Sequence, residues 1–144
     1  MTLNEIQRQE MSKLYMMKAH DALQTAKDDK NAHPNSSISR CYYSMFYAAQ
    51  SLLILEGYAG LHRHEGVNVK FSDLFVKTGE FPKEVFRTMG NLEQSRYKAD
   101  YDPRANFTSK EADEYINSAE VFINNVEKII DEKISKQAGQ TKEL

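Results

Sequence analysis

Apolar residues recur at three- and four-residue intervals over most of the chain, which is the periodicity of amphipathic helices. Thr108 and Glu111 stand at the spacing of a capping box, so we predict that a helix begins at Thr108. Residues 135–144 are polar, and we predict a disordered tail there. The most regular apolar stripe of the chain lies between Thr108 and residue 135. It consists of Ala112, Tyr115, Ile116, Ala119, Phe122, Ile123, Val126, Ile129, Ile130 and Ile134.

Two long segments in the first half of the chain have the same periodicity. Thr2 and Glu5 stand at the spacing of a capping box, so a helix is predicted to begin there. Residues 3–31 carry a loose apolar stripe that ends before Pro34, because proline disfavours helical backbone in the residue that precedes it. Residues 36–57 carry a denser stripe that ends at Gly57, a residue type common just past the C-terminus of a helix. Each segment is therefore predicted to form one helix.

The middle of the chain is predicted to contain two more helices. Residues 82–101 begin with proline, which favours the first turn of a helix, and carry apolar residues on one face. Residues 67–78 have a weaker pattern, since β-branched residues lower helix propensity. Long helices joined by short loops pack as antiparallel neighbours. The predicted fold class is therefore all-α, an up-and-down bundle of four to five helices over residues 1–134, with no sheet.

Composition and charge exclude several classes of protein. The length of 144 residues fits one domain, and a single cysteine, Cys41, excludes an internal disulfide or a Cys-only zinc site. Cys41 lies on the apolar stripe of residues 36–57, which predicts a core residue. A net charge of −2 excludes a broadly basic surface for nucleic acids. No apolar run approaches the roughly 18 residues of a membrane span, and no signal-peptide pattern is visible. We therefore expect a cytoplasmic protein without a membrane partner.

Arg96 is the most informative residue of segment 82–101, because it lies on the apolar face of that predicted helix. Asp100 follows one helical turn later, so the two side chains can form an ion pair, and Tyr101 ends the helix. A buried arginine is costly unless its charge is paired. The pair is either structural, or Arg96 binds phosphate, since a guanidinium matches phosphate oxygens in a bidentate fashion.

A second polar stripe lies along the predicted helix 36–57. Arg40, Tyr43, Ser44 and Tyr47 share one side of it, at helical spacing. Tyrosine rings can stack on bases and an arginine can hold phosphate. The alternative is that these residues pack against a neighbouring helix or a dimer partner, and from this stripe alone that alternative is favoured.

The loop after Gly57 contains His62, His64 and Glu65. Two histidines separated by one residue could ligate a metal, but a third and a fourth ligand are not evident in the sequence. A solvated loop is the favoured interpretation, and the sequence predicts neither a metal nor a cofactor.

Three ordered blocks of the sequence resemble one family. Residues 39–49 are similar to the R-x-Y-Y-x-x-F-x-A-A helix of HEPN proteins (higher eukaryotes and prokaryotes nucleotide-binding domain). Residues 75–79 and 96–101, the latter reading R-Y-K-A-D-Y, resemble the same subgroup in the same order. The resemblance implies an all-α bundle and a homodimer. It also implies a prokaryotic protein that works beside a minimal nucleotidyltransferase, as a toxin–antitoxin-like pair.

Many HEPN proteins are metal-independent ribonucleases, and the resemblance implies an arginine that holds phosphate and a histidine four to six residues later that assists proton transfer. In this sequence Arg96 matches the arginine, but Tyr101 stands where the histidine is expected. Tyrosine is a poor base at neutral pH, since its hydroxyl ordinarily titrates at about pH 10. If the protein is a ribonuclease, Tyr101 or Asp100 must replace the histidine.

Three functions remain open from the sequence. The favoured one is a module that binds a nucleotide, RNA or a nucleotidyltransferase through Arg40, Tyr43, Ser44, Tyr47 and Arg96. The second is a ribonuclease with the altered motif formed by Arg96, Asp100 and Tyr101. The third is a helical dimer whose only role is to bind another protein.

Overall fold

The central element of the fold is a helix that the other helices surround. The computed structural model of the protein describes residues 3–58, 60 and 63–143, and this part of the chain contains no strand. Its elements are α1 (Leu3–Asp29), α2 (Pro34–Leu55), α3 (His64–Phe71), the short π-helix η1 (Ser72–Val76), α4 (Lys83–Tyr101) and α5 (Ser109–Glu143). The prediction of an all-α bundle is thereby confirmed.

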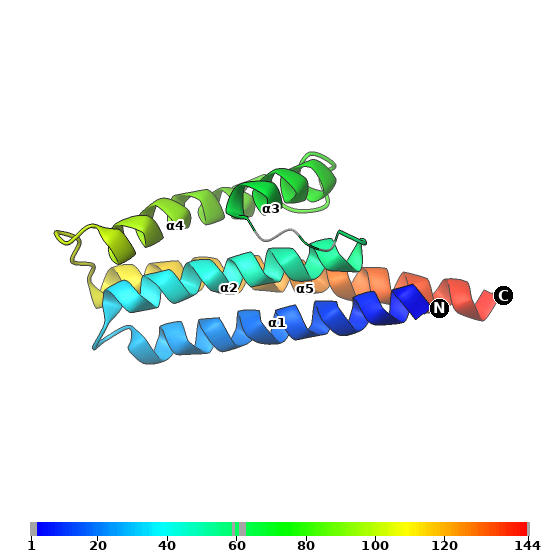
Figure 1. Ribbon diagram of the computed structural model, residues 1–144, viewed down its shortest axis with the longest axis horizontal. Helices are drawn as coiled ribbons and strands as arrows, with labels where there is room; N and C mark the ends of the chain where they lie inside the picture. The colour runs from blue at the N-terminus through cyan, green and yellow to red at the C-terminus, as the bar shows by residue number, and fades with distance from the viewer. Residues whose placement is uncertain (1–2, 59, 61–62, 144) are drawn as a thin grey trace.

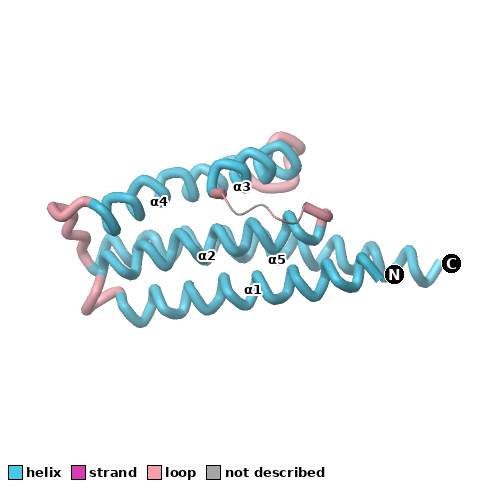
Figure 2. Tube along the Cα trace, viewed as in Figure 1, coloured by secondary structure: helices cyan, strands magenta, loops and turns pink. Residues whose placement is uncertain are grey.

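Helix α2 packs against α1, α3, α4 and α5. Figure 1 shows α1 on one side of α2, α3 and α4 on the other side, and α5 running behind α2. The long helices alternate in direction (Figure 2). Short loops join α1 to α2 and α4 to α5, whereas α3 and η1 lie between α2 and α4. Because α2 has neighbours on most of its sides, most of its residues are buried, including Cys41, which confirms the prediction of a core cysteine.

Two predicted boundaries are wrong for physical reasons. Helix α2 begins at Pro34 rather than at residue 36, because a proline fits the first turn of a helix, where its missing N–H is not needed. Helix α5 continues through residues 135–143, where we predicted a disordered tail. This stretch lacks proline and contains good helix formers such as Lys136 and Ala138. The side chain of Gln137 also accepts a 2.6 Å hydrogen bond from the amide of Gln9 in α1.

The predicted capping boxes have different outcomes. At the start of α5, the Thr108 backbone N–H donates to Glu111 at 3.0 Å, and the Glu111 N–H donates to the Thr108 hydroxyl at 3.1 Å. This reciprocal pair confirms the capping box and fixes the start of α5. Thr2, the first member of a similar pair with Glu5 near the N-terminus, lies outside the described residues.

The segment predicted as one helix over residues 67–78 is two elements. A hydrogen bond from the Lys77 N–H to the Ser72 carbonyl, 2.9 Å long, closes the wider turn of η1. Aromatic rings anchor both elements, since Phe71 lies 5.0 Å from Phe81 and 5.9 Å from Phe122 of α5 between ring centroids. These contacts hold the end of α3 against the loop before α4 and against α5. None of the helices in the described part of the chain combines the length and the apolar character that crossing a bilayer requires.

Candidate functional site

Arg96 lies on the buried face of α4, with only 8% of the residue exposed. Its guanidinium carbon lies 5.2 Å from the ring centroid of Tyr42, 5.9 Å from that of Tyr43 and 6.0 Å from that of Tyr101. Helix α2 supplies the first two rings, and the last turn of α4 supplies the third. Cation–π attraction to three rings holds the guanidinium in one position where two helices meet.

The carboxylate partner of Arg96 does not satisfy all of its donors. Its Nη1 lies 3.7 Å from Oδ2 of Asp100, which is an ion pair but is longer than a hydrogen bond. The same oxygen accepts a 3.2 Å hydrogen bond from the hydroxyl of Ser39. The Nε of Arg96 is buried and has no hydrogen-bond partner among the described residues. A buried donor without an acceptor is rare and unfavourable, so this atom is suited to an acceptor supplied by a ligand.

His64, the first residue of α3, joins the same cluster. Its ring centroid lies 4.5 Å from Phe46, 5.3 Å from Tyr42 and 6.1 Å from Tyr43. Its Nδ1 lies 2.6 Å from the hydroxyl of Tyr42. The prediction of a solvated loop is therefore wrong for His64, because α3 begins there and packs the ring against α2. His62 lies outside the described residues.

The local environment keeps His64 neutral. Burial lowers the pKa of His64 below its ordinary value, and the positive charge of Arg96 lowers the pKa further, while Glu93 acts in the opposite direction. Burial also raises the pKa of Tyr42, so its hydroxyl keeps its proton at neutral pH. The site therefore combines a fixed cation with a neutral imidazole and a neutral phenol.

The polar stripe predicted on α2 is only partly assembled at this site. Tyr43 lies under Arg96 and also under Arg40, whose guanidinium is 5.1 Å from the ring. Tyr47 continues the row at 6.2 Å from Tyr43 and contacts a lysine of α1 rather than Arg96. Ser44 is not part of the site, because it is fully buried and its hydroxyl donates to the carbonyl of Cys41 at 2.7 Å.

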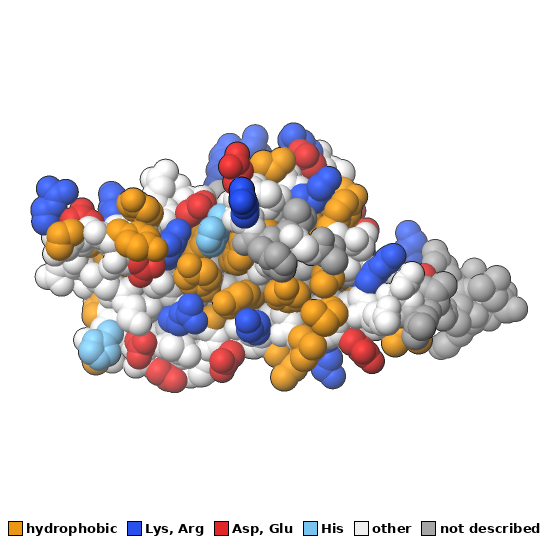
Figure 3. Space-filling view, in the orientation of Figure 1, with side chains coloured by type: hydrophobic (Ala, Val, Ile, Leu, Met, Phe, Trp, Pro, Cys, Tyr) orange, Lys and Arg blue, Asp and Glu red, His pale blue; other side chains and the backbone are white. Residues whose placement is uncertain are grey.

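An exposed pair of rings lies beside the buried arginine. Tyr97 and Tyr101 are 62% and 64% exposed, and their ring centroids are 5.0 Å apart. Exposed tyrosines next to a fixed cation form a surface on which the bases of a single strand can stack. Figure 3 shows one face of the molecule, where hydrophobic side chains gather over α2 between the charged margins.

Sequence reasoning missed three members of this cluster: His64, Tyr42 and Tyr97. Tyr42 lies on the apolar stripe of α2, and Tyr97 carries no spacing signal of its own. His64 precedes Arg96 by 32 positions, and only the packing of α3 onto α2 brings it to the site. No periodicity in the sequence reports such a contact.

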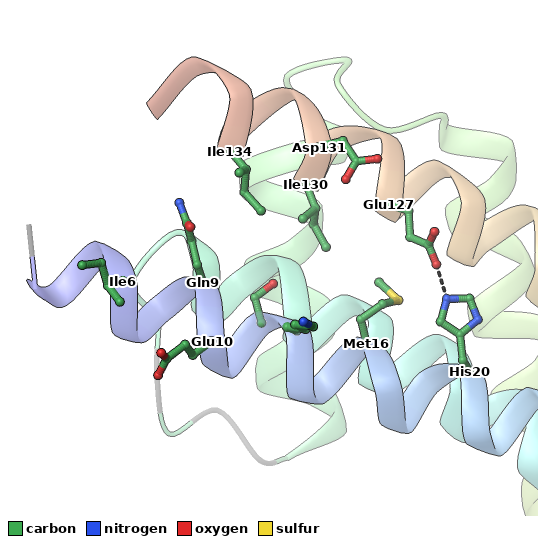
Figure 4. Close-up of a pocket in the computed structure, with 11 residues that line it drawn as sticks. Ile6, Gln9, Glu10, Met16, His20, Glu127, Ile130, Asp131 and Ile134 are labelled. Carbon is green, nitrogen blue, oxygen red and sulfur yellow. Dashed lines mark hydrogen bonds and ion pairs between the residues drawn. The ribbon is translucent and has the colours of Figure 1, made fainter. Parts of the chain in front are cut away.

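A separate groove lies between α1 and α5 (Figure 4). It has a volume of about 490 Å³, and His20 forms an ion pair with Glu127 at its edge. The groove is lined by Ile6, Gln9, Glu10, Ser12, Lys13, Met16, His20, Glu127, Ile130, Asp131 and Ile134. Three carboxylates among these residues repel anions, so this groove does not suit a phosphate.

Sequence comparison with known proteins identifies the family. A model of the HEPN domain matches residues 12–129. A "UPF0332 protein" of Thermotoga maritima is 32% identical over 103 residues, which are 72% of this chain and 77% of that protein. A protein of Methanocaldococcus jannaschii named "Putative toxin" is 30% identical over 124 residues, 85% of this chain and 83% of the relative. A second protein of that organism with the same designation is 30% identical over 131 residues, 90% of this chain and 96% of the relative.

The blocks 39–49 and 96–101 lie on α2 and α4, and the block 75–79 runs from the end of η1 into the turn that follows it. All three fall inside the matched region. The five α-helices of the described residues agree with the all-α bundle that this resemblance implies. The chain therefore belongs to the HEPN domain family.

Proposed function

We propose that the protein is a nucleotide- or RNA-binding module, and that Arg96 is its phosphate-binding residue. The observation that carries the proposal is the buried Nε of Arg96, a donor without an acceptor on a guanidinium held between tyrosine rings. A phosphate oxygen supplies that acceptor together with the opposite charge. Arg40 adds a second cation next to Tyr43, and Tyr97 and Tyr101 offer exposed rings to bases.

The chemistry of the site favours a phosphate-binding role for Arg96 over a purely structural ion pair with Asp100. A structural ion pair in a buried position is expected to satisfy its donors at hydrogen-bond distance. Here the contact between Arg96 and Asp100 is 3.7 Å long, and one donor is unused. Arg40 and Arg96, with tyrosine rings between them, can recognise phosphate and bases without a broadly basic surface. This agrees with the chain's net charge of −2.

The biological setting that we propose is a toxin–antitoxin-like system with a minimal nucleotidyltransferase as the protein partner. The support is the HEPN family itself and the relatives that carry the name of a toxin. Copurification of the protein with a nucleotidyltransferase encoded beside it tests this part, and separate elution of the two proteins after coexpression contradicts it.

Removal of the Arg96 side chain is the direct test of the binding function. We expect the R96A variant to lose affinity for nucleotides and short single-stranded RNAs by roughly 10- to 100-fold, the range of a lost charge-assisted hydrogen bond. Fluorescence anisotropy of labelled RNA measures the change. The matched control is R87A, which removes an exposed arginine from the same helix. Equal losses in the two variants contradict a specific site.

We also propose a homodimer formed through the outer side of α1. Met11, Leu14 and Met17 are 41%, 54% and 59% exposed there, and contiguous exposed apolar side chains mark interaction surfaces. Hydrophobic side chains protrude over α1 in Figure 3. Sedimentation analysis is expected to give twice the 16.6 kDa chain mass for the wild type and the single chain mass for L14E/M17E.

The control for the dimer is V121E, which changes an exposed apolar residue of α5 that lies outside this surface. This variant is expected to remain dimeric. A wild-type protein that sediments as a single chain contradicts the homodimer. That result would not contradict the proposed RNA-binding site, because all of its residues come from one chain.

A further inference from the structure

A row of tyrosine rings continues from the candidate site along one side of α2. Tyr43, which lies under Arg96, is followed about one helical turn later by Tyr47, and the two ring centroids are 6.2 Å apart. Both tyrosines are half-buried, so each ring is held by packing and keeps part of its surface exposed. The row therefore extends beyond the ring that Arg96 contacts.

Cations from three helices lie over these rings. Besides Arg96 of α4, the guanidinium of Arg40 in α2 lies 5.1 Å from the ring centroid of Tyr43, and Nζ of Lys18 in α1 lies 5.0 Å from that of Tyr47. We call Arg96, Arg40, Tyr43, Tyr47 and Lys18 the cation–tyrosine track. In Figure 3, side chains coloured as hydrophobic, which include tyrosine, follow α2, and Lys or Arg side chains lie on both sides of them. Positive charges and rings thus alternate from α4 across α2 to α1.

Two of the three cations of the track are not used by the fold. Lys27, on the same helix as Lys18, forms an ion pair with Glu120 of α5 at 2.6 Å. By contrast, neither Lys18 nor Arg40 forms an ion pair with any residue that the structure describes. A cation over the face of a ring can still donate hydrogen bonds to a phosphate. Lys18 and Arg40 are therefore available to a ligand.

The length of the track corresponds to several nucleotides. Arg40 and Tyr47 are seven residues apart on α2, which is about 10 Å at 1.5 Å per residue. Phosphates of one stacked strand follow each other at about 3.4 Å along its axis, so about three nucleotides cover this distance. Lys18 of α1 adds a further contact at the Tyr47 end. A mononucleotide can occupy only part of the track.

We propose that the ligand of the Arg96 site is a single strand of RNA several nucleotides long, and that Tyr47 and Lys18 hold the part of the strand that lies over α2 and α1. This inference rests on the proposed function, because it requires a phosphate of the strand at Arg96. Unpaired bases stack on Tyr43 and Tyr47, and Lys18 pairs with a phosphate. Bases inside a duplex do not expose their faces to such rings, so the track selects single strands.

The ligands of the first test are a labelled single-stranded RNA of about eight nucleotides, a duplex of the same sequence and a dinucleotide, each titrated into the full-length protein. We expect the wild type to bind the single strand at least about 10-fold more tightly than either of the other two, since each stacked base contributes about 1–3 kcal/mol. The K18Q variant is expected to reduce the steepness of the salt dependence of log K for the single strand by about 0.7, the value for one phosphate contact. The matched control is K13Q, which changes an exposed lysine of α1 that lines the separate groove.

The contribution of Tyr47 is tested with Y47F and Y47L. Y47F keeps the face of the ring and is expected to bind the single strand as the wild type does, whereas Y47L is expected to bind it at least about 5-fold more weakly. Because Lys18 adjoins Met11, Leu14 and Met17 of the proposed dimer surface, all variants are compared at a protein concentration at which they sediment as the wild type does.

The outcomes separate the two proposals. A wild type that binds none of the three ligands contradicts the proposed function. Equal wild-type affinity for the dinucleotide and the single strand, or equal salt dependence in K18Q and the wild type, overturns the track and leaves the Arg96 site intact. Equal binding by Y47F and Y47L overturns the stacking role of Tyr47. Lys18 is an exposed side chain, so the result for K18Q does not depend on the stability of Y47L.

Discussion

The double variant R96M/D100L is expected to fold as well as the wild type and to lose its affinity for RNA. Replacement of a buried ion pair by apolar side chains of similar size is often neutral or stabilising. Arg96 is almost fully buried and the side chain of Asp100 is 30% exposed, so methionine and leucine can occupy their space against the tyrosine rings. The phosphate-binding donors are absent from the variant, and we expect a loss of affinity of roughly 10- to 100-fold.

Two measurements on the same samples decide between a structural and a functional arginine. Denaturant unfolding reports the free energy of unfolding, which we expect to equal or exceed that of the wild type. Titration with a short RNA reports affinity, and R87M provides the control for the loss of one positive charge from α4. Retained RNA affinity in R96M/D100L would show that the ion pair between Arg96 and Asp100 only stabilises the helical bundle.

Replacement of Phe71 by alanine is expected to cause a large loss of stability. Phe71 is fully buried at the end of α3, and its ring contacts Phe75, Phe81 and Phe122 at centroid distances of 5.2, 5.0 and 5.9 Å. Truncation of a buried phenylalanine costs about 3–5 kcal/mol, through lost transfer free energy and the cavity that remains. The expected result is a lower unfolding midpoint with an unchanged denaturant slope.

The control for Phe71 is V69A on the same helix, because Val69 is 56% exposed. Its effect is expected to stay within about 0.5 kcal/mol. A loss of stability below about 1 kcal/mol in F71A would contradict a role of this aromatic cluster in anchoring α3. The position of His64 depends on the same aromatic cluster, because His64 is the first residue of α3 and Phe71 is the last.

The long helices could be predicted from sequence because each has an unambiguous apolar stripe. The regular spacing from Ala112 to Ile134, with Thr108 and Glu111 before it, predicts α5 and the capping box at its start. The position of Arg96 among apolar residues also predicts that it is buried beside Asp100. Local spacing contains this information, because residues three and four apart share one side of a helix.

The parts that could not be predicted depend on contacts between distant segments. A π-turn changes the periodicity over only a few residues, so the pattern of Ser72–Val76 reads as ordinary helix. The end of α5 is polar because little of it is covered by other helices, and polarity alone does not distinguish an exposed helix from a disordered tail. His64 reaches the site because α3 packs onto α2, and no spacing in the sequence contains that contact.

In the proposed binding site, the Nε of Arg96 donates a hydrogen bond to a phosphate of the bound nucleotide or RNA. The most direct measurement is the ¹H–¹⁵N NMR signal of the Arg96 side-chain Nε–H, assigned with R96K, during titration with a short single-stranded RNA. We expect a large downfield proton shift that saturates with the binding curve obtained from anisotropy. An Arg96 Nε–H signal that stays unchanged while RNA binds would contradict this role of Arg96.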